Sequence, residues 1–299
     1  MENKHLKIGT RGSKLALWQA NFLHASLNKI NVSSELVIIK TQGDKIQDVG
    51  FDKMEGKGFF TKEIEEALIK AQIDVAVHSM KDMPTENPEE LVITAISQRA
   101  NPADWMLIKG SSVDIEKGLN LKQNAVVGSS SSRRKGQILG FRPDLQLVDL
   151  RGNVPTRVNK LRTEKYDAII LAAAGLERLE LDLSEFAIIK FNPKEFIPAP
   201  AQGVMAYQTR KDNTFARRIL KNVHHSSTAD QTNVERKVLN MMNGSCHLPI
   251  GVYCERDDAG HYHVWASYGK DWQKPMKTVQ ISQSTSHQMA ERIVKALKN

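Results

Sequence analysis

Apolar and polar positions along much of the chain alternate between short β-type runs and helical periods. The first unit of this pattern is a predicted strand at residues 6–8, a turn at 9–13 and a helix after it. The apolar face of that helix is predicted to consist of Leu15, Trp18, Phe22 and Ala25. Further strands are predicted over residues 36–39, 75–77, 91–96, 125–127, 145–150, 167–171 and 204–207. Strands that alternate with helices indicate an open α/β sheet.

The chain is predicted to divide into three domains. Residues 1–98 together with 199–220 form the first α/β domain, because the strand at 204–207 is expected to return to it after a proline-rich segment. Residues 99–198 form the second α/β domain. Residues 221–299 carry a helix, two strand-like segments and a closing helix from Ser286, which is typical of a small α+β domain.

The segment 41–58 shows neither pattern. It holds four glycines and seven charged residues in eighteen positions, so it cannot pack and is predicted to be a mobile surface loop. Loops of this length are functional lids or are disordered. The helix that follows is predicted to be capped by Thr61 and to bury Ile64, Ala67, Leu68 and Ala71.

Composition narrows the class of protein. Hydrophobic residues make up 40% and charged residues 25%, the balance of a globular protein. The longest apolar run, 168–174, is far shorter than the roughly 20 residues of a membrane helix, and the polar start lacks a signal peptide's apolar segment. We therefore expect a cytoplasmic protein that does not enter a membrane. Two cysteines, Cys246 and Cys254, cannot form a disulfide framework and are expected to stay thiols.

The formal net charge of +8 predicts an anionic partner. Aromatic residues are only 6%, and no block of five or more basic residues occurs. The positive charge is therefore not concentrated as in a nucleic-acid-binding protein, and no nucleic acid is expected. A small acidic ligand fits better, while a nucleic-acid binder would show affinity that falls steeply with salt.

Basic and hydroxyl side chains gather after several predicted strands. A serine run and two arginines lie between a strand and a helix: Ser129, Ser130, Ser131, Ser132, Arg133 and Arg134. Hydroxyls, unpaired N–H groups at a helix start and guanidinium groups together suit a carboxylate or phosphate, although a flexible linker would also be rich in serine. Other such residues follow other strands: Arg11, Ser13, Lys81, Arg151 and Arg157. Several cations at strand ends suggest a ligand with several carboxylates.

Two further residues are candidates for chemistry. Asp82 is the acidic member of this basic set and would stabilise a cationic intermediate or relay a proton, but an aspartate before Met-Pro is also a common turn former. Cys246 stands beside His247 in a glycine- and proline-flanked loop, where an accessible thiol would serve as a nucleophile or a covalent tether. A metal site is not expected, because no spaced histidine or cysteine ligands occur.

The motifs together resemble the porphobilinogen deaminase family over nearly the whole chain. The resemblance rests on six segments in the family's order: 9–19, 56–63, 77–84, 130–134, 150–157 and 246–251. It implies two domains like type II periplasmic binding proteins with a cleft between them, and a third domain with a cofactor cysteine. It also implies a transferase that joins four porphobilinogen molecules head to tail, releases ammonia each time, and frees hydroxymethylbilane by hydrolysis. We expect the protein to be a monomer.

By the same resemblance, individual residues receive roles. Cys246 is expected to hold a dipyrromethane cofactor through a thioether, and Asp82 to stabilise the cation formed when ammonia leaves. The positions that match the family's carboxylate-binding residues are Arg11, Ser13, Gln19, Lys81, Ser129, Ser130, Ser131, Ser132, Arg133, Arg134, Arg151, Arg157 and Arg178. The lid and an aromatic that stacks on a pyrrole ring correspond to Lys53, Lys57 and Phe60.

The sequence departs from the family's pattern in two places. Ser132 stands where relatives usually have leucine, and Ala201, Gln208 and Thr209 replace glycine, glutamate and cysteine near the predicted hinge. A rival interpretation is a two-lobed receptor or sensor that binds an anion without chemistry. Such a protein would have no need of Cys246.

Overall fold

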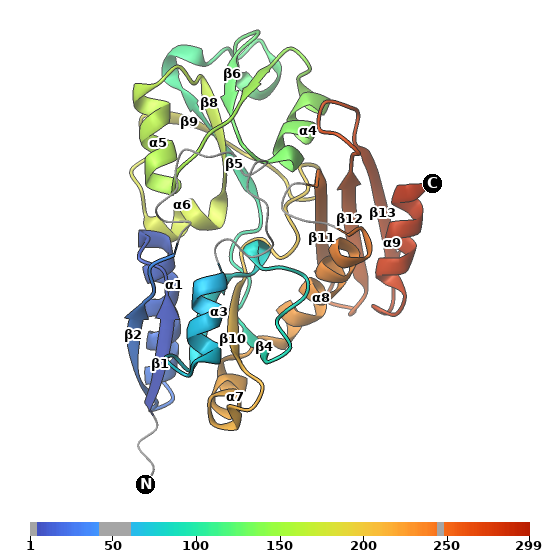
Figure 1. Ribbon diagram of the computed structural model, residues 1–299. Coiled ribbons are helices and arrows are strands. Elements are labelled where there is room, and N and C mark those ends of the chain that lie inside the picture. The colour runs from blue at the N-terminus through green and yellow to red at the C-terminus, as the bar shows by residue number, and fades with distance from the viewer. Residues whose placement is uncertain (1–4, 42–60, 244–247) are drawn as a thin grey trace. The chain divides into compact units, whose positions relative to one another are not determined.

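The computed structural model describes residues 5–41, 61–243 and 248–299, and they form two compact units (Figure 1). Unit 1 comprises Met1–Ala100 with Gly203–Ala229, and unit 2 comprises Asn101–Gln202 with Asp230–Asn299. The described residues contain two five-stranded sheets, a three-stranded sheet and helices on their faces. This confirms the predicted α/β class, while the three domain boundaries stay a prediction.

The first sheet belongs to unit 1 and has the order β2-β1-β3-β10-β4. Its strands are β1 His5–Thr10, β2 Ser33–Ile38, β3 Val75–Ser79, β4 Leu91–Ile96 and β10 Met205–Arg210. β1 runs parallel to β2 and β3, whereas β10 is antiparallel to both of its neighbours, β3 and β4. The strand expected to rejoin the first domain therefore does so, and it lies inside the sheet rather than at its edge.

Helices cover both faces of the first sheet. They are α1 Lys14–Asn28, α3 Lys62–Ile69 and α7 Thr214–Leu220. One core joins α1 and α7 to the sheet through Leu23, Leu27 and Leu220, and the other joins α3 to it through Ile64 and Leu68. The buried face predicted for α3 is confirmed except for Ala71, which lies past the helix end, exposed and with φ of 56°.

The apolar face predicted for α1 is largely wrong, because Phe22 and Ala25 are exposed and Trp18 alone of the four predicted residues packs against the core. The helix buries Gln19, Ala20, Leu23 and Leu27, whereas Phe22 is 43% exposed and stacks on Trp18 with ring centroids 5.5 Å apart. Two apolar stripes run along this helix, and periodicity alone cannot say which of them meets the sheet.

The second sheet belongs to unit 2 and repeats the arrangement of the first, with the order β7-β6-β8-β5-β9. Its strands are β5 Asp104–Lys109, β6 Val126–Gly128, β7 Gln146–Val148, β8 Ala168–Ala172 and β9 Phe186–Lys190. β6 is parallel to β7 and β8, and β5 is antiparallel to β8 and β9. The helices around it are α4 Ser132–Phe141, α5 Val154–Thr163 and α6 Ala173–Leu179.

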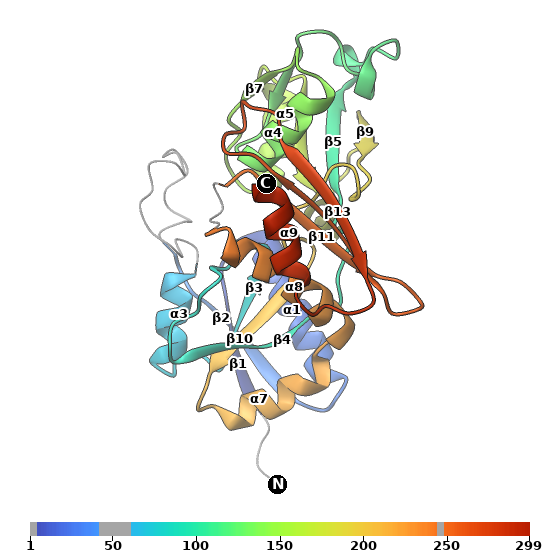
Figure 2. The ribbon, with the colours of Figure 1, turned by 90° about the vertical axis from the view of Figure 1, so that its right-hand side faces the viewer.

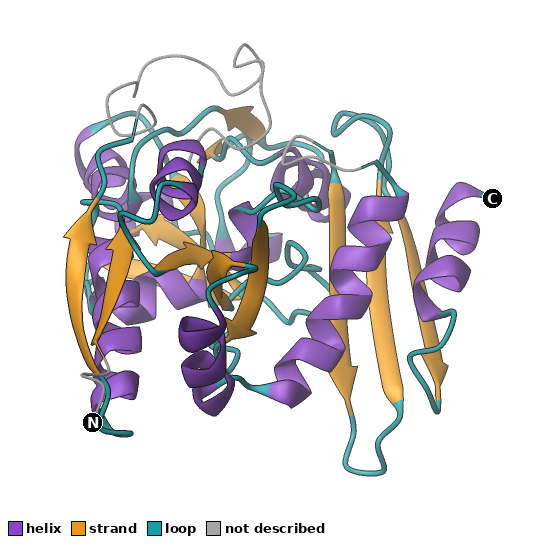
Figure 3. Cartoon of the chain, turned by 60° about the horizontal axis from the view of Figure 1, so that its bottom comes forward, coloured by secondary structure: helices purple, strands orange, loops and turns teal. Residues whose placement is uncertain are grey.

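The third sheet, also in unit 2, is an antiparallel meander of β11 Ile250–Arg256, β12 Tyr262–Tyr268 and β13 Lys277–Gln283. Its core is formed with α8 Ser226–Met241 and α9 Met289–Lys298. Figures 2 and 3 show the two helices beside this sheet. The predicted helix, two strands and closing helix of this region are confirmed. Short 3-10 helices in the described residues are Met80–Asp82, Gly110–Ser112, Gly118–Asn120 and Lys221–Val223. In the described part of the chain, no helix is both long and apolar enough to cross a bilayer.

Candidate functional site

Unit 1 carries five predicted site residues at or near the edge of the first sheet that is formed by the carboxyl ends of β1 and β3. They are Arg11, Ser13, Gln19, Lys81 and Asp82. β1 ends at Thr10 and β3 at Ser79, and because these paired strands are parallel, the residues after them emerge at the same edge. The 3-10 turn Met80–Asp82 follows β3 and places Lys81 half-buried and Asp82 exposed. Ser13 caps α1, because its hydroxyl accepts a hydrogen bond from the N–H of Ala16 at 3.3 Å.

Gln19 is buried and contacts the end of β3. Its side chain is 3% exposed, and its Nε2 donates to the hydroxyl of Ser79 at 2.9 Å. Gln19, which is predicted to contact a ligand carboxylate, therefore also connects α1 to β3. The turn with Lys81 and Asp82 follows directly after β3. Its contact with a ligand stays a prediction.

A buried histidine on β3 was not identified from the sequence. His78 Nε2 lies 3.1 Å from Gln208 Oε1, and Gln208 Nε2 donates to Glu65 Oε1 at 3.0 Å. Burial lowers the pKa of His78 to about 4, outweighing the hydrogen bond to Gln208, and the positive charge of Arg11 acts in the same direction. Because the Gln208 amide nitrogen donates to a carboxylate, its oxygen must accept from His78, so Nε2 carries a proton. With a pKa of about 4 the ring is neutral near pH 7. The signal in the sequence is a histidine that directly continues the apolar run of residues 75–77.

In unit 2 the serine run forms the turn between β6 and α4. Ser129 is buried, and the Ser130 hydroxyl donates to the carbonyl of Leu150 at 2.9 Å and accepts from its N–H at 3.0 Å. Ser131 is the N-cap of α4 and accepts from the N–H of Arg134 at 3.4 Å, while Ser132 opens the helix. The run is thus ordered structure at the carboxyl end of a strand, as predicted, and not a flexible linker.

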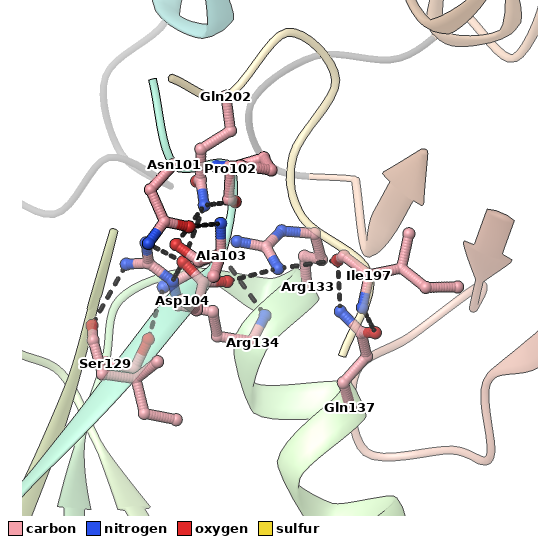
Figure 4. Close-up of polar contacts among 12 residues, drawn as sticks. Asn101, Pro102, Ala103, Asp104, Ser129, Arg133, Arg134, Gln137, Ile197 and Gln202 are labelled. Atoms are coloured by element: carbon pink, nitrogen blue, oxygen red, sulfur yellow. Dashed lines mark hydrogen bonds and ion pairs between the residues drawn. The ribbon is translucent and has the colours of Figure 1, made fainter. Parts of the chain in front are cut away.

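Arg133 and Arg134 point to a buried carboxylate that the sequence analysis missed (Figure 4). Asp104 is fully buried, and its Oδ1 accepts from Arg134 Nε at 3.2 Å and Nη2 at 2.7 Å. Arg133 Nη1 lies 2.8 Å from Oδ2. Burial would raise the pKa of Asp104, but the two guanidinium groups outweigh it and hold that pKa well below its usual range.

The other three arginines predicted for unit 2 are half-buried near the ends of β7 and β8. Arg151 Nη2 lies 3.9 Å from Asp149 Oδ2, and Arg157 Nε donates to the carbonyl of Gly152 at 2.7 Å. Arg178 lies in the last turn of α6. Gly152 has φ of 110°, which only glycine adopts without strain, and the turn it makes places Asn153 as the N-cap of α5.

Four predicted residues, Lys53, Lys57, Phe60 and Cys246, lie outside the described part of the chain. The other cysteine, Cys254, is fully buried in the core of the third sheet, as an inert structural thiol would be. Within the described residues, no group of three His, Cys, Asp or Glu side chains is arranged to hold a metal ion.

Each unit therefore presents cations, hydroxyls and helix N-termini where its parallel strands end. Such groups suit carboxylates, because guanidinium and ammonium donors form charge-assisted hydrogen bonds and a helix N-terminus attracts negative charge. A cofactor with acidic side chains fits these residues.

Comparison with known proteins gives the following similarities. The family described as "Porphobilinogen deaminase, dipyromethane cofactor binding domain" matches residues 6–218. A porphobilinogen deaminase of Geotalea daltonii is 45% identical over 258 residues, which cover 85% of this chain and 79% of that protein. One of Clostridium novyi is 42% identical over 255 residues, which cover 83% and 82%. Among solved structures, a methionine binding protein, MetQ, matches 79% of this chain and 96% of that one, with a TM-score of 0.46 and 13% identity.

Proposed function

The chain belongs to the porphobilinogen deaminase family, and from this premise we propose how its own residues carry out the reaction. The protein is a transferase that makes hydroxymethylbilane, and it contains a domain that binds the dipyrromethane cofactor. In the proposed mechanism, Cys246 anchors the cofactor, and four porphobilinogen molecules are added head to tail with the loss of four ammonia molecules. Hydrolysis then releases the linear product.

The observation that supports this proposal is the gathering of basic side chains after the parallel strands of both large sheets. Each pyrrole carries an acetate and a propionate, so the oligomer accumulates negative charge as it lengthens. Half-buried groups such as Lys81 and Arg151 offset that charge better than water-exposed ones, because the local dielectric is lower. The dipyrromethane supplies a terminal pyrrole carbon at which the chain starts.

Asp82 is proposed to act on the reacting pyrrole. Its carboxylate is exposed on the turn after β3, next to Lys81 and at the same sheet edge as Arg11. A fixed anion there stabilises the cation left when porphobilinogen loses ammonia, and it is already in place when the charge develops.

The first test is the intact mass of the purified protein. We expect the mass to exceed that of the sequence by one dipyrromethane, and Cys246→Ser to abolish the excess. Cys254→Ser is the matched control, because Cys254 is buried, and it should retain the added mass. An unmodified protein from cells that make porphobilinogen, or loss of the mass only in Cys254→Ser, would contradict the assignment of Cys246.

The second test is the turnover of Asp82→Asn. The substitution removes a charge and leaves the shape nearly unchanged, so the variant should keep the added mass and lose roughly a hundredfold or more of its ammonia release. Glu89→Gln, an exposed carboxylate of the same loop, should leave the rate unchanged. Near-normal turnover of Asp82→Asn would assign the stabilising role to another group.

The alternative of a two-lobed anion receptor predicts porphobilinogen binding without release of ammonia. No observation on the described residues favours it over the enzyme. A monomeric, cytoplasmic protein remains our expectation, to be checked by light scattering and by fractionation of the cells.

A further inference from the structure

Asp104 occupies a position in unit 2 that the order of the strands explains. It is the first residue of β5, and because β5 is antiparallel to β8, Asp104 pairs with Ala172 at the end of β8. The start of β5 therefore lies at the same edge of the second sheet as the end of β6 and the serine turn. This brings an acidic side chain, which the sequence analysis did not identify, to the edge where the predicted site residues of the second sheet are basic or carry hydroxyls.

The contacts of Asp104 fix two arginines at once. Arg134 approaches Oδ1 with both Nε and Nη2, and its Nη1 donates to the carbonyl of Ile170 at 3.1 Å. Arg133 approaches Oδ2 with Nη1, which also donates to the carbonyl of Ile197 at 2.9 Å. Arg134 is thus held in a defined plane by two hydrogen bonds to the carboxylate and one to a backbone oxygen, whereas Arg133 is held by an ion pair with Oδ2 and by one hydrogen bond to a backbone oxygen.

The carboxylate is itself fixed by the segment that leads out of the second sheet. Gln202 Nε2 donates to Asp104 Oδ1 at 2.9 Å and to the carbonyl of Pro102 at 2.7 Å. Gln137 on α4 forms two hydrogen bonds with the backbone of Ile197, accepting from its N–H at 2.6 Å and donating to its carbonyl at 2.9 Å. Figure 4 shows these residues around Asp104. The arginines, the carboxylate and the backbone therefore form one connected set of contacts.

We propose that Asp104 is a positioning residue of the reaction, which orients Arg133 and Arg134 so that their remaining N–H donors meet the carboxylates of the pyrrole chain in one geometry. The inference rests on the proposed function, and it gives Asp104 a role beyond balancing charge. Two guanidinium groups and one carboxylate carry a net charge of +1. If Asp104 only balanced charge, its removal would strengthen the attraction for an anionic substrate; if it positions the arginines, its removal weakens binding despite the added positive charge.

The test is the KM for porphobilinogen of Asp104→Asn, measured on protein whose dipyrromethane content is checked by mass. We expect KM to rise about tenfold or more, because misplacing binding groups by an ångström weakens their contacts with substrate and transition state. Asp144→Asn is the matched control. Asp144 accepts two hydrogen bonds at 2.7 Å from Arg142, at the other end of α4. That variant should lose thermal stability while its KM stays within about twofold of the wild type.

A second comparison covers the case in which Asp104→Asn does not fold, since it leaves two buried guanidinium groups facing each other. The double variant Asp104→Asn with Arg134→Gln restores the balance of charge, and its KM should exceed that of Arg134→Gln alone by about fivefold or more. The proposal would be overturned if the double variant and Arg134→Gln had equal KM values, or if the KM of Asp104→Asn were unchanged or lowered. Failure of both Asp104 variants to fold would also overturn it. Absence of ammonia release and of the added mass in the wild type would instead overturn the proposed function.

Discussion

Gly251 offers a direct measure of how closely the third sheet approaches the chain that leaves the second sheet. It is the second residue of β11, and a Cβ atom placed on it would lie 2.5 Å from the carbonyl oxygen of Ile197 and 3.1 Å from the carbonyl carbon. Backbone atoms cannot rotate away as a side chain would. Gly251→Ala therefore forces the segment around Ile197 to move.

The loss in the free energy of unfolding follows from the contacts that this movement disturbs. Overpacking costs about 1–3 kcal/mol, and weakening the hydrogen bond from Val252 N–H to the carbonyl of Pro198, 3.0 Å long, adds about 1 kcal/mol. Alanine also lowers the conformational entropy of the unfolded chain relative to glycine, which stabilises the folded protein by roughly 0.5–1 kcal/mol. The free energy of unfolding should therefore fall by about 2 kcal/mol.

Urea unfolding followed by tryptophan fluorescence measures this difference. Gly140→Ala is the control, because Gly140 is exposed on α4 and a Cβ there meets no atom within 4 Å. It should be neutral or stabilise the protein by up to about 1 kcal/mol through helix propensity. A Gly251→Ala protein within about 0.5 kcal/mol of the wild type would refute the steric argument, as would an equal loss in both variants.

Two further predictions concern groups near the strand ends. The pKa of His78 is about 4 when folded, against 6.5 as its ordinary value, so the unfolded chain takes up the proton first. The stability that neutral His78 contributes is complete above pH 6.5 and is lost as the pH falls towards 4, by up to about 3 kcal/mol. His78→Gln should flatten that part of the stability-against-pH curve, and an unchanged slope would contradict the assignment. Asn153→Ala removes the N-cap of α5, where Asn153 Oδ1 accepts from the N–H of Thr156 at 3.0 Å. The free energy of unfolding, measured with urea, should fall by about 1 kcal/mol. Asn159→Ala, the control, should leave it unchanged.

Most parallel strands of the two large sheets could be predicted because they contain a short apolar run that ends in a polar turn, whereas β9 was missed. β5 could not, although five of its six residues are buried. Its tryptophan and aliphatic residues follow a proline-containing segment that was interpreted as a domain crossing, and a continuous apolar run has no period that separates strand from helix. β13 was missed for the opposite reason, because its sequence is largely polar and none of its residues is fully buried.

The same limit explains what was missed in the candidate site. Basic residues after parallel strands share an edge by a general rule, so Arg11, Arg133 and Arg151 could be placed at sheet edges from the sequence. Asp104 reaches Arg134 only because β5 runs against its neighbours, and strand order and direction are not written in local patterning. The exposure of Asp82 on its turn agrees with the predicted turn, while its chemical role rests on the proposed function.

The position of β10 between β3 and β4 has a consequence for how the chain folds during its synthesis on the ribosome. Every strand of the second sheet lies between β4 and β10 in the chain, so that sheet is fully translated before the first sheet can be finished. Until β10 emerges, β3 and β4 each present an unpaired edge that another nascent chain could join. The order of synthesis therefore allows the later-encoded sheet to be completed first, and leaves the N-terminal sheet with unpaired strand edges for the interval between.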